Sequence, residues 1–165
     1  MNEFELIQRL TASLSAHPQV LVGPGDDCAV LESGLPDRVL LFKTDAVVEN
    51  IHFTPETAPE RIGHKALGRC LSDIAAMAGT PTAALVTAAL PRRFEVERVD
   101  GIYAGMRALA QRHGVAIAGG ETTTNPGGLL LSIALLGWAP RNKTLLRSGA
   151  KPGDAIFVSG ELGGS

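Results

Sequence analysis

One long helical pattern, followed later by a second, most constrains what this chain can fold into. The first begins near Glu60, and its apolar side chains share one broad face when each residue is advanced by 100°, until Gly79 and Pro81 end it. That face comprises Ile62, Ala66, Leu67, Cys70, Leu71, Ile74, Ala75 and Ala78. The second pattern runs over about residues 95–113. Two such helices predict a layered fold in which they cover a sheet.

Strands are predicted where short apolar runs lie between turn residues. A helix over residues 3–16 comes first and is stopped by Pro18, and the polar segment 122–128 is a turn between two later runs. The runs are residues 20–22, 28–31, 39–42, 83–90, 115–118, 129–138 and 155–159. This order predicts an α+β domain with a mixed or antiparallel sheet and two main helices on one face. Because the last run leads into the loop 160–165, we expect residues 1–165 to be the first domain of a longer protein.

Composition excludes some classes of partner. The net charge of -2 leaves no basic patch, which argues against nucleic acid. No apolar run is long enough for a membrane span, and the first residues lack the pattern of a signal peptide. We therefore expect a cytoplasmic protein in which Cys28 and Cys70 are reduced, buried thiols rather than a disulfide.

Five acidic side chains stand in Gly-rich or apolar surroundings. They are Asp26, Asp27, Asp45, Asp73 and Glu121. A carboxylate in such surroundings is costly unless a cation or hydrogen-bond donors compensate it. A shared hard divalent cation would resolve the repulsion between several of them, and Mg²⁺ prefers oxygen ligands and phosphates. The pattern predicts Mg²⁺ and phosphate chemistry.

Each acidic segment also has an ordinary structural interpretation. Asp26 and Asp27 could form a solvated turn. The Lys43-Thr44-Asp45 segment ends an apolar run, so it could offer a hydroxyl and a carboxylate to Mg²⁺ or form a hydrogen-bonded strand terminus. Asp73, at the edge of the helical apolar face, could instead pair with Arg69 four residues earlier.

Two further segments carry weaker signals. His52 follows Asp45 by seven residues and is either a substrate contact or a packed or surface histidine. The glycines of Gly119-Gly120-Glu121 could bind an anion through their N–H groups or simply form a tight turn. The sequence has neither a G-x-x-x-x-G-K-[ST] phosphate loop nor the protein-kinase signature set, so any nucleotide would be bound by another architecture.

Taken in order, these segments resemble the N-terminal domain of the thiamine-monophosphate kinase family, in the aminoimidazole-ribonucleotide-synthetase-like superfamily. The most discriminating stretch is Val48-Glu-Asn-Ile-His-Phe. The other matching stretches are Gly25-Asp-Asp-Cys-Ala-Val-Leu, Thr44-Asp-Ala-Val-Val, Gly63-His-Lys-Ala-Leu, Leu71-Ser-Asp-Ile-Ala-Ala-Met, Gly119-Gly-Glu-Thr-Thr and Arg147-Ser-Gly-Ala-Lys-Pro-Gly-Asp. Together they cover nearly all of the chain.

The resemblance implies an enzyme that phosphorylates thiamine monophosphate to thiamine diphosphate with ATP. The acceptor phosphate attacks directly, Mg²⁺ ions neutralise charge, and no residue forms a phospho-enzyme, so catalysis rests on positioning and metal electrostatics. The family also implies a homodimer formed through the sheets of this domain. The implied metal ligands are Asp27, Thr44, Asp45, Asp73 and Glu121, with Lys43 at the same cluster; His52 contacts thiamine phosphate, and Tyr103, Gly120, Glu121 and Arg147 contact ATP.

Two positions depart from the family pattern. Lys43 stands where the family usually has Thr, and its charge could either replace one metal or repel it. Glu121 stands where the family usually has Asp, and the extra methylene disturbs a near-octahedral Mg²⁺ site. Because the family's second domain completes the active site, we expect this chain alone to fold and dimerise but to be weakly active or inactive.

Two alternatives remain open. One is another ATP-using enzyme of the superfamily, such as a hydrogenase-maturation dehydratase. The other is a non-catalytic dimerisation or nucleotide-binding module, which the changes at Lys43 and Glu121 would favour.

Overall fold

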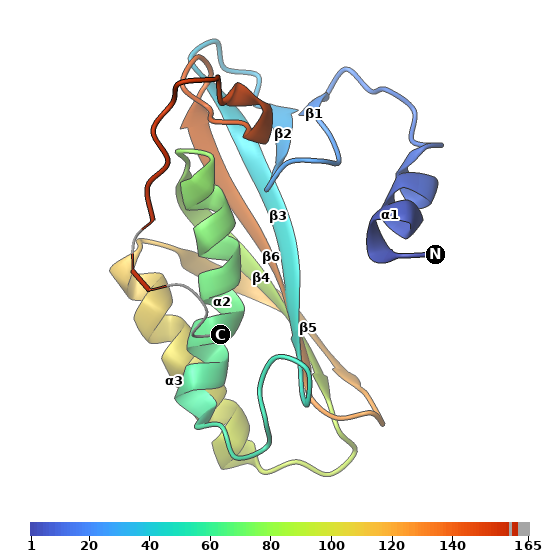
Figure 1. Ribbon diagram of the computed structural model, residues 1–165. Helices are drawn as coiled ribbons and strands as arrows, with labels where there is room; N and C mark the ends of the chain where they lie inside the picture. The colour runs from blue at the N-terminus through green and yellow to red at the C-terminus, as the bar shows by residue number, and fades with distance from the viewer. Residues whose placement is uncertain (159, 162–165) are drawn as a thin grey trace.

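Two helices cover one face of a six-stranded sheet in the computed structural model, which describes residues 1–158, 160 and 161 (Figure 1). The strand order is β1-β2-β3-β6-β4-β5. Strands β4 and β5 are parallel and are joined through α3, and the other neighbouring pairs are antiparallel. The strands are β1 (Val20–Val22), β2 (Ala29–Glu32), β3 (Arg38–Val48), β4 (Thr80–Leu90), β5 (Ala116–Thr124) and β6 (Leu130–Pro140). This arrangement confirms the predicted α+β fold with a mixed sheet.

The core lies between the sheet and the helices α2 (Pro59–Ala76) and α3 (Val96–Arg112). The α2 side chains that the periodicity assigned to the apolar face are buried as far as Ile74. Ala75 and Ala78 are exposed instead, and Met77 is fully buried. Ala78 lies past the end of the helix at Ala76 and takes a positive φ of 56°, so the 100° periodicity does not reach it, whereas Ala75 is on the helix but at the outer edge of the apolar face.

Strand β3 is longer than the apolar run 39–42 predicted. It continues to Val48 because β6 pairs with it along its whole length, from Arg38 opposite Pro140 to Val48 opposite Leu130. Lys43, Thr44 and Asp45 therefore lie inside a central strand and not at its end. Successive side chains of a strand point to opposite faces of the sheet. Lys43 and Asp45 therefore share one face, and Thr44 lies on the other.

Strand β5 also extends past its predicted end at residue 118. It runs from Ala116 to Thr124 and pairs with β4, so the two glycines lie in an edge strand and not in a turn. Gly120 has a φ of 152°, and a Cβ there would overlap the carbonyl oxygen of Val86. The glycine therefore permits the close approach of β5 to β4.

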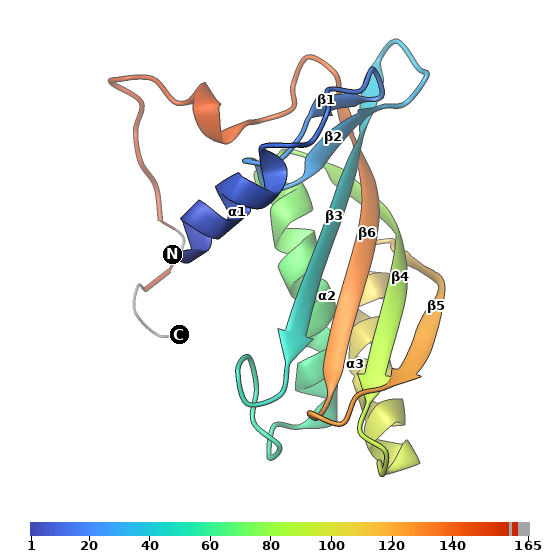
Figure 2. The same ribbon diagram turned by 90° about the vertical axis from the view of Figure 1, so that its right-hand side faces the viewer.

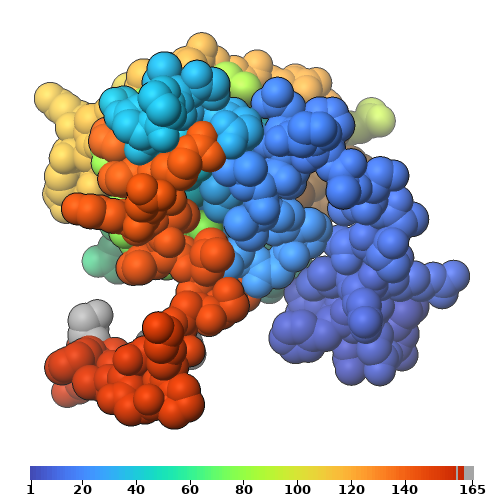
Figure 3. All heavy atoms as spheres, turned by 90° about the horizontal axis from the view of Figure 1, so that it is seen from above, coloured from blue at the N-terminus to red at the C-terminus, as the bar shows by residue number. Residues whose placement is uncertain are grey.

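The N-terminal helix stands away from this body (Figures 1 and 3), and so do residues 155–158 near the other end of the chain (Figures 2 and 3). Helix α1 (Glu3–Thr11) is shorter than the predicted 3–16, because none of its side chains is buried and it packs on no other element. No strand forms over residues 155–158, where one was predicted, and Ser159 lies outside the described residues. Within the described ranges, no helix is both long and apolar enough to cross a membrane.

The face of the sheet opposite α2 and α3 is open. Figure 2 shows this face toward the viewer, with the two helices behind it. Phe42 on β3 and Leu85 on β4 are exposed there, at 47% and 52%, beside the partly buried Leu136 and Trp138 of β6. An apolar surface on the central strands of a sheet is a feature of interaction faces.

Candidate functional site

Two ion pairs join β3 to α2 on the helix-covered face. The Lys43 Nζ atom lies 2.6 Å from Asp73 Oδ2. Arg69 donates from Nε and Nη2 to the two Asp45 carboxylate oxygens, both at 3.0 Å. The spacing explains why both pairs form: two residues along a strand span about 6.6 Å, and four along a helix span about 6 Å. Lys43 and Asp45 thus face Asp73 and Arg69 in antiparallel order.

A third ion pair closes the end of this region nearest β2. The Arg147 Nη2 group donates to Asp27 Oδ1 at 2.5 Å, and the Arg147 backbone N–H donates to Asp26 Oδ2 at 3.2 Å. Arg147 belongs to the short helix η1 (Arg147–Gly149) that follows the long strand β6. The sequence-distant segments 26–27 and 147–149 therefore meet beside β3.

Lys43 connects the two halves of the site. It lines a depression of about 350 Å³ together with Asp26 and Asp27, and it pairs with Asp73. Asp73 and Asp45 line a second depression of about 530 Å³ along α2. The other polar residues of that second depression are His64, Lys65, Arg69 and Ser72. Asp45 and Asp73 thus share the helix-covered face, whereas the depression beside Asp27 is reached by Lys43 and is also lined by Phe42 of the open face.

The ion pairs determine the protonation states of Asp45 and Lys43. Burial alone raises the pKa of Asp45, but hydrogen bonds from Arg69 and from the Ala46 N–H outweigh it and hold that pKa below its usual value. Burial alone lowers the pKa of Lys43, but the hydrogen bond and charge of Asp73 hold it above its usual value. Both side chains are therefore ionised at neutral pH.

Thr44 points away from Asp45 and Asp73, although it lines the depression that contains Lys43, Asp26 and Asp27. Strand alternation places it on the open face, where its Oγ1 lies 3.4 Å from Ser132 Oγ. The Thr44 hydroxyl and the Asp45 carboxylate therefore do not reach the same side of the sheet, contrary to the arrangement expected for a strand terminus.

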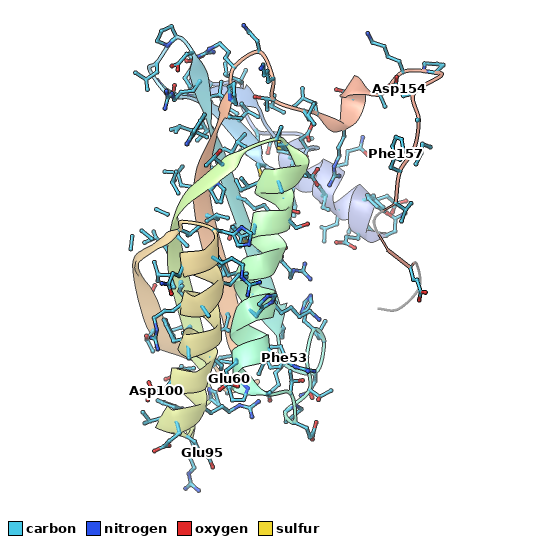
Figure 4. The ribbon with its side chains drawn as sticks, turned by 90° about the vertical axis from the view of Figure 1, so that its left-hand side faces the viewer. Phe53, Glu60, Glu95, Asp100, Asp154 and Phe157 are labelled. Carbon is cyan, nitrogen blue, oxygen red and sulfur yellow. The ribbon has the colours of Figure 1, made fainter. Side chains whose placement is uncertain are left out.

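His52 lies in the loop between β3 and α2. Its Nδ1 accepts a hydrogen bond from the Val48 N–H at 3.1 Å, and its carbonyl oxygen accepts one from Lys65 Nζ at 2.5 Å. The neighbouring Phe53 lies toward the end of the molecule opposite Asp154 (Figure 4). His52 contacts Lys65 on α2 whereas Arg147 contacts Asp27, so these two predicted contacts lie at different ends of the site.

The remaining predicted ATP contacts lie outside the carboxylate cluster. Tyr103 is partly buried on α3 and packs against the core. Gly120 and Glu121 lie on β5, where Glu121 pairs with Thr87. Strand β5 is three strand spacings from β3, about 14 Å. Within one chain, Glu121 and Asp45 are too far apart to bind the same ion.

The donor chemistry of Asp27, Asp45 and Asp73 fits a hard divalent cation, because carboxylate oxygens are the ligands that Mg²⁺ prefers. The positions of these three carboxylates fit a shared metal ion less well. In the part of the chain that the structure describes, no three His, Cys, Asp or Glu side chains are close enough together to hold a metal. Each of the three carboxylates is bound to a lysine or arginine instead.

Sequence reasoning missed the role of Arg69. Its expected alternative partner was Asp73 on the same helix, but it binds Asp45 across the layer. His64 and Lys65 were not assigned to the site either. The recurrence of Lys65, Arg69 and Asp73 at intervals of four residues is a signal for one polar helix face that could have found them.

Most of the region that contains the site matches a known protein family. A family model described as "AIR synthase related protein, N-terminal domain" matches residues 25–139. The thiamine-monophosphate kinase of Rhodopirellula baltica is 44% identical over 155 residues, which are 90% of this chain and 48% of that protein. The chain spans about half the length of the curated relatives it matches.

Solved structures agree with this match. A structure of AaThiL complexed with AMPPCP and TMP superposes with a TM-score of 0.80 at 30% identity, covering 90% of this chain and 45% of that one. The HypE–HypF complex matches with a TM-score of 0.68, covering 90% of this chain and 46% of that one, but at 20% identity it shows the fold alone.

Proposed function

The chain belongs to the AIR synthase related proteins through their N-terminal domain, and on this basis we propose that it is the ATP-binding part of a thiamine-monophosphate kinase. One structural observation carries the proposal: Lys43 links carboxylates from three separate segments, because it pairs with Asp73, its charge acts on Asp45, and it lines one depression with Asp27. Charged groups arranged in this way suit phosphoryl transfer, which depends on positioning and electrostatics.

In the proposed reaction a phosphate oxygen of thiamine monophosphate bonds to the γ-phosphorus of ATP. The bond from that phosphorus to the β,γ-bridging oxygen breaks, and thiamine diphosphate and ADP leave without a phospho-enzyme. Asp27, Asp45 and Asp73 would hold Mg²⁺, which supplies positive charge to the phosphates. The Arg147 side chain, 64% exposed, would exchange Asp27 for an ATP phosphate.

His52 would bind the thiamine phosphate at the far end of the same helix face. Lys65 contacts the His52 carbonyl and lines the depression that contains Asp45 and Asp73. Its ammonium and the Arg69 guanidinium therefore form a row of positive charge from the His52 loop to the carboxylates. Such a row would direct the substrate phosphate toward ATP.

A homodimer would complete the nucleotide site. Glu121 lies on β5, whose pairing places it with Thr87 on the open face of the sheet, so its carboxylate would serve a site formed with a second copy. The apolar residues Phe42 and Leu85 lie on that same face and would form the contact. We also propose that the protein acts in the cytoplasm and that a C-terminal domain completes the active site. The isolated chain would then be weakly active or inactive.

The dehydratase alternative is not favoured, because the curated relatives and the superposed AMPPCP complex are thiamine-monophosphate kinases. A non-catalytic nucleotide-binding module is the second candidate. The observation in its favour is that Asp27, Asp45 and Asp73 are already neutralised by protein cations.

Isothermal titration of AMPPCP into this chain, with and without Mg²⁺, tests the proposal. We expect binding that requires Mg²⁺ and is lost in Asp45→Asn and Asp27→Asn, while Asp37→Asn, an exposed carboxylate remote from the cluster, binds as the wild type does. Binding that is independent of Mg²⁺ and of both carboxylates would support the module and contradict the kinase. Robust turnover of thiamine monophosphate by this chain would refute the need for a second domain.

A further inference from the structure

Lys43 is held more firmly than the other cations of the site. Its strand, β3, pairs with β6 along its whole length, Lys43 lying opposite Leu135, and with β2 as far as the preceding residue, Phe42, so its backbone has little freedom. The side chains of Lys43 and Asp73 are each only 23% exposed. Arg147, by contrast, is largely exposed on a short helix. The Arg147–Asp27 pair can therefore open for a ligand, whereas the Lys43–Asp73 pair is part of the β3–α2 interface.

The Asp45–Asp73 end of the site has no uncompensated negative charge. Lys43 faces Asp73, and Arg69 holds both oxygens of Asp45. Lys43 and Asp45 are two residues apart on one strand face; the ammonium forms an ion pair with Asp73, and its charge also acts on the Asp45 carboxylate. A divalent ion between these carboxylates would have to displace two protein cations or lie beside an ammonium in a half-buried region, where repulsion between like charges is strong.

We propose that the Lys43 ammonium is the resident cation between Asp45 and Asp73, in the place where a divalent ion would otherwise join them. The chain then binds one divalent ion fewer than it would with an uncharged residue at position 43. The inference rests on the proposed function for its consequence, which is that Lys43 meets a nucleotide phosphate directly. A lysine suits both tasks, because its compact charge neutralises a carboxylate and its three N–H groups can also serve a phosphate oxygen.

Titration with Mn²⁺, without nucleotide, tests the inference, because free aqueous Mn²⁺ gives an electron paramagnetic resonance signal that is lost on binding. Lys43→Met and Lys43→Gln remove the charge at similar length, and Lys43→Arg keeps it. Lys143→Met removes an exposed lysine outside both depressions. Far-ultraviolet circular dichroism and urea unfolding establish which variants are folded. Because two uncharged variants are compared, the titration still gives an answer if one of them fails to fold.

We expect Lys43→Met and Lys43→Gln to bind one more Mn²⁺ per chain than the wild type, with affinity at that position raised by about tenfold or more. Lys43→Arg and Lys143→Met should match the wild type. Adding Asp73→Asn to Lys43→Met should remove the extra ion, which locates it. An unchanged ion count in folded uncharged variants would overturn the inference, as would the same gain in Lys143→Met or a gain that survives Asp73→Asn.

The titration separates this inference from the proposed function. If the uncharged variants gain an ion but AMPPCP binds no form of the chain, the resident-cation assignment stands and the kinase proposal loses its support. If AMPPCP binds with Mg²⁺ as expected but position 43 has no effect on Mn²⁺, the kinase proposal stands and the resident-cation assignment is wrong.

Discussion

Arg69 on α2 and Asp45 on β3 form a two-pronged ion pair, in which both carboxylate oxygens accept a hydrogen bond at 3.0 Å. Their side chains are 38% and 22% exposed, so water screens the pair only in part. The pair crosses the interface between the sheet and the helix layer, beside the fully buried Cys70. It therefore serves the packing of α2 as well as the proposed site.

Asp45→Asn should destabilise the fold moderately at neutral pH. The change removes the charge that Arg69 faces, and we expect the free energy of unfolding to fall by about 1 kcal/mol, since partial exposure limits the effect. Urea unfolding measures it. Asp37→Asn, which breaks the more exposed pair with Arg38, is the control and should change little. An equal effect of the two substitutions would show that the Asp45 pair has no special role.

The contribution of Asp45 should disappear in acid. Its folded-state pKa is held below the ordinary value of 3.8, so the stabilisation is present above that pH and is lost as pH falls through the lower, folded-state pKa. The difference in unfolding free energy between the wild type and Asp45→Asn should thus be constant above about pH 5 and shrink below about pH 4. A difference that grows in acid would contradict this sign.

Cys28 and Cys70 should resist thiol reagents in the folded chain. Both are buried, and burial raises the pKa of Cys28 to about 11 and that of Cys70 to about 12. At about pH 8 only about one Cys28 side chain in a thousand is a thiolate, which is the reactive form. Reaction with Ellman's reagent should be slow until guanidinium chloride unfolds the chain and releases both thiols. Rapid labelling of one thiol before unfolding would show that its burial is transient.

Gly120→Ala should disrupt the pairing of β5 with β4. The new Cβ would overlap the Val86 carbonyl oxygen, and the φ of 152° adds backbone strain, so we expect a loss of about 3 kcal/mol or more. Gly119→Ala is the matched control, because Gly119 has a similar φ of 145° but its Cβ would meet only Leu85 Cδ2, at 4.0 Å. Thermal unfolding compares the two. Equal losses would mean that strain alone, and not the close approach of the strands, requires glycine at position 120.

The sequence predicted the layers of this fold well because the apolar periodicity of residues 62–74 reports burial directly. It predicted strand ends poorly. Lys43 and Asp45 are polar, so local composition ends the strand before them, whereas pairing with β6 continues it. Pairing between strands that are distant in the sequence cannot be inferred from the local composition. The expectation that Thr44 and Asp45 act together was therefore made without knowing that both lie inside a paired strand.

The candidate site, too, could be predicted from the sequence only in part. Asp27, Asp45 and Asp73 could be selected from their surroundings, because a carboxylate beside apolar residues needs compensation. The compensating groups could not be assigned, because Lys43 and Arg69 find their partners across the sheet–helix interface. The four-residue spacing suggested Asp73, on the same helix, as the partner of Arg69. The position of α2 along β3 decides for Asp45 instead, and the sequence does not show that position.

Leu85→Lys should prevent the proposed dimer. Leu85 is 52% exposed on the open face of the sheet, and burying a lysine charge against a second copy would be costly. We expect a dimer for the wild type and a monomer for Leu85→Lys in analytical ultracentrifugation, with no loss of secondary structure because the side chain points away from the core. Leu145→Lys, at a similarly exposed residue beyond the end of β6, should remain dimeric. A wild-type chain that stays monomeric, or a dimer that Leu85→Lys leaves intact, would place any contact between copies elsewhere than the open face.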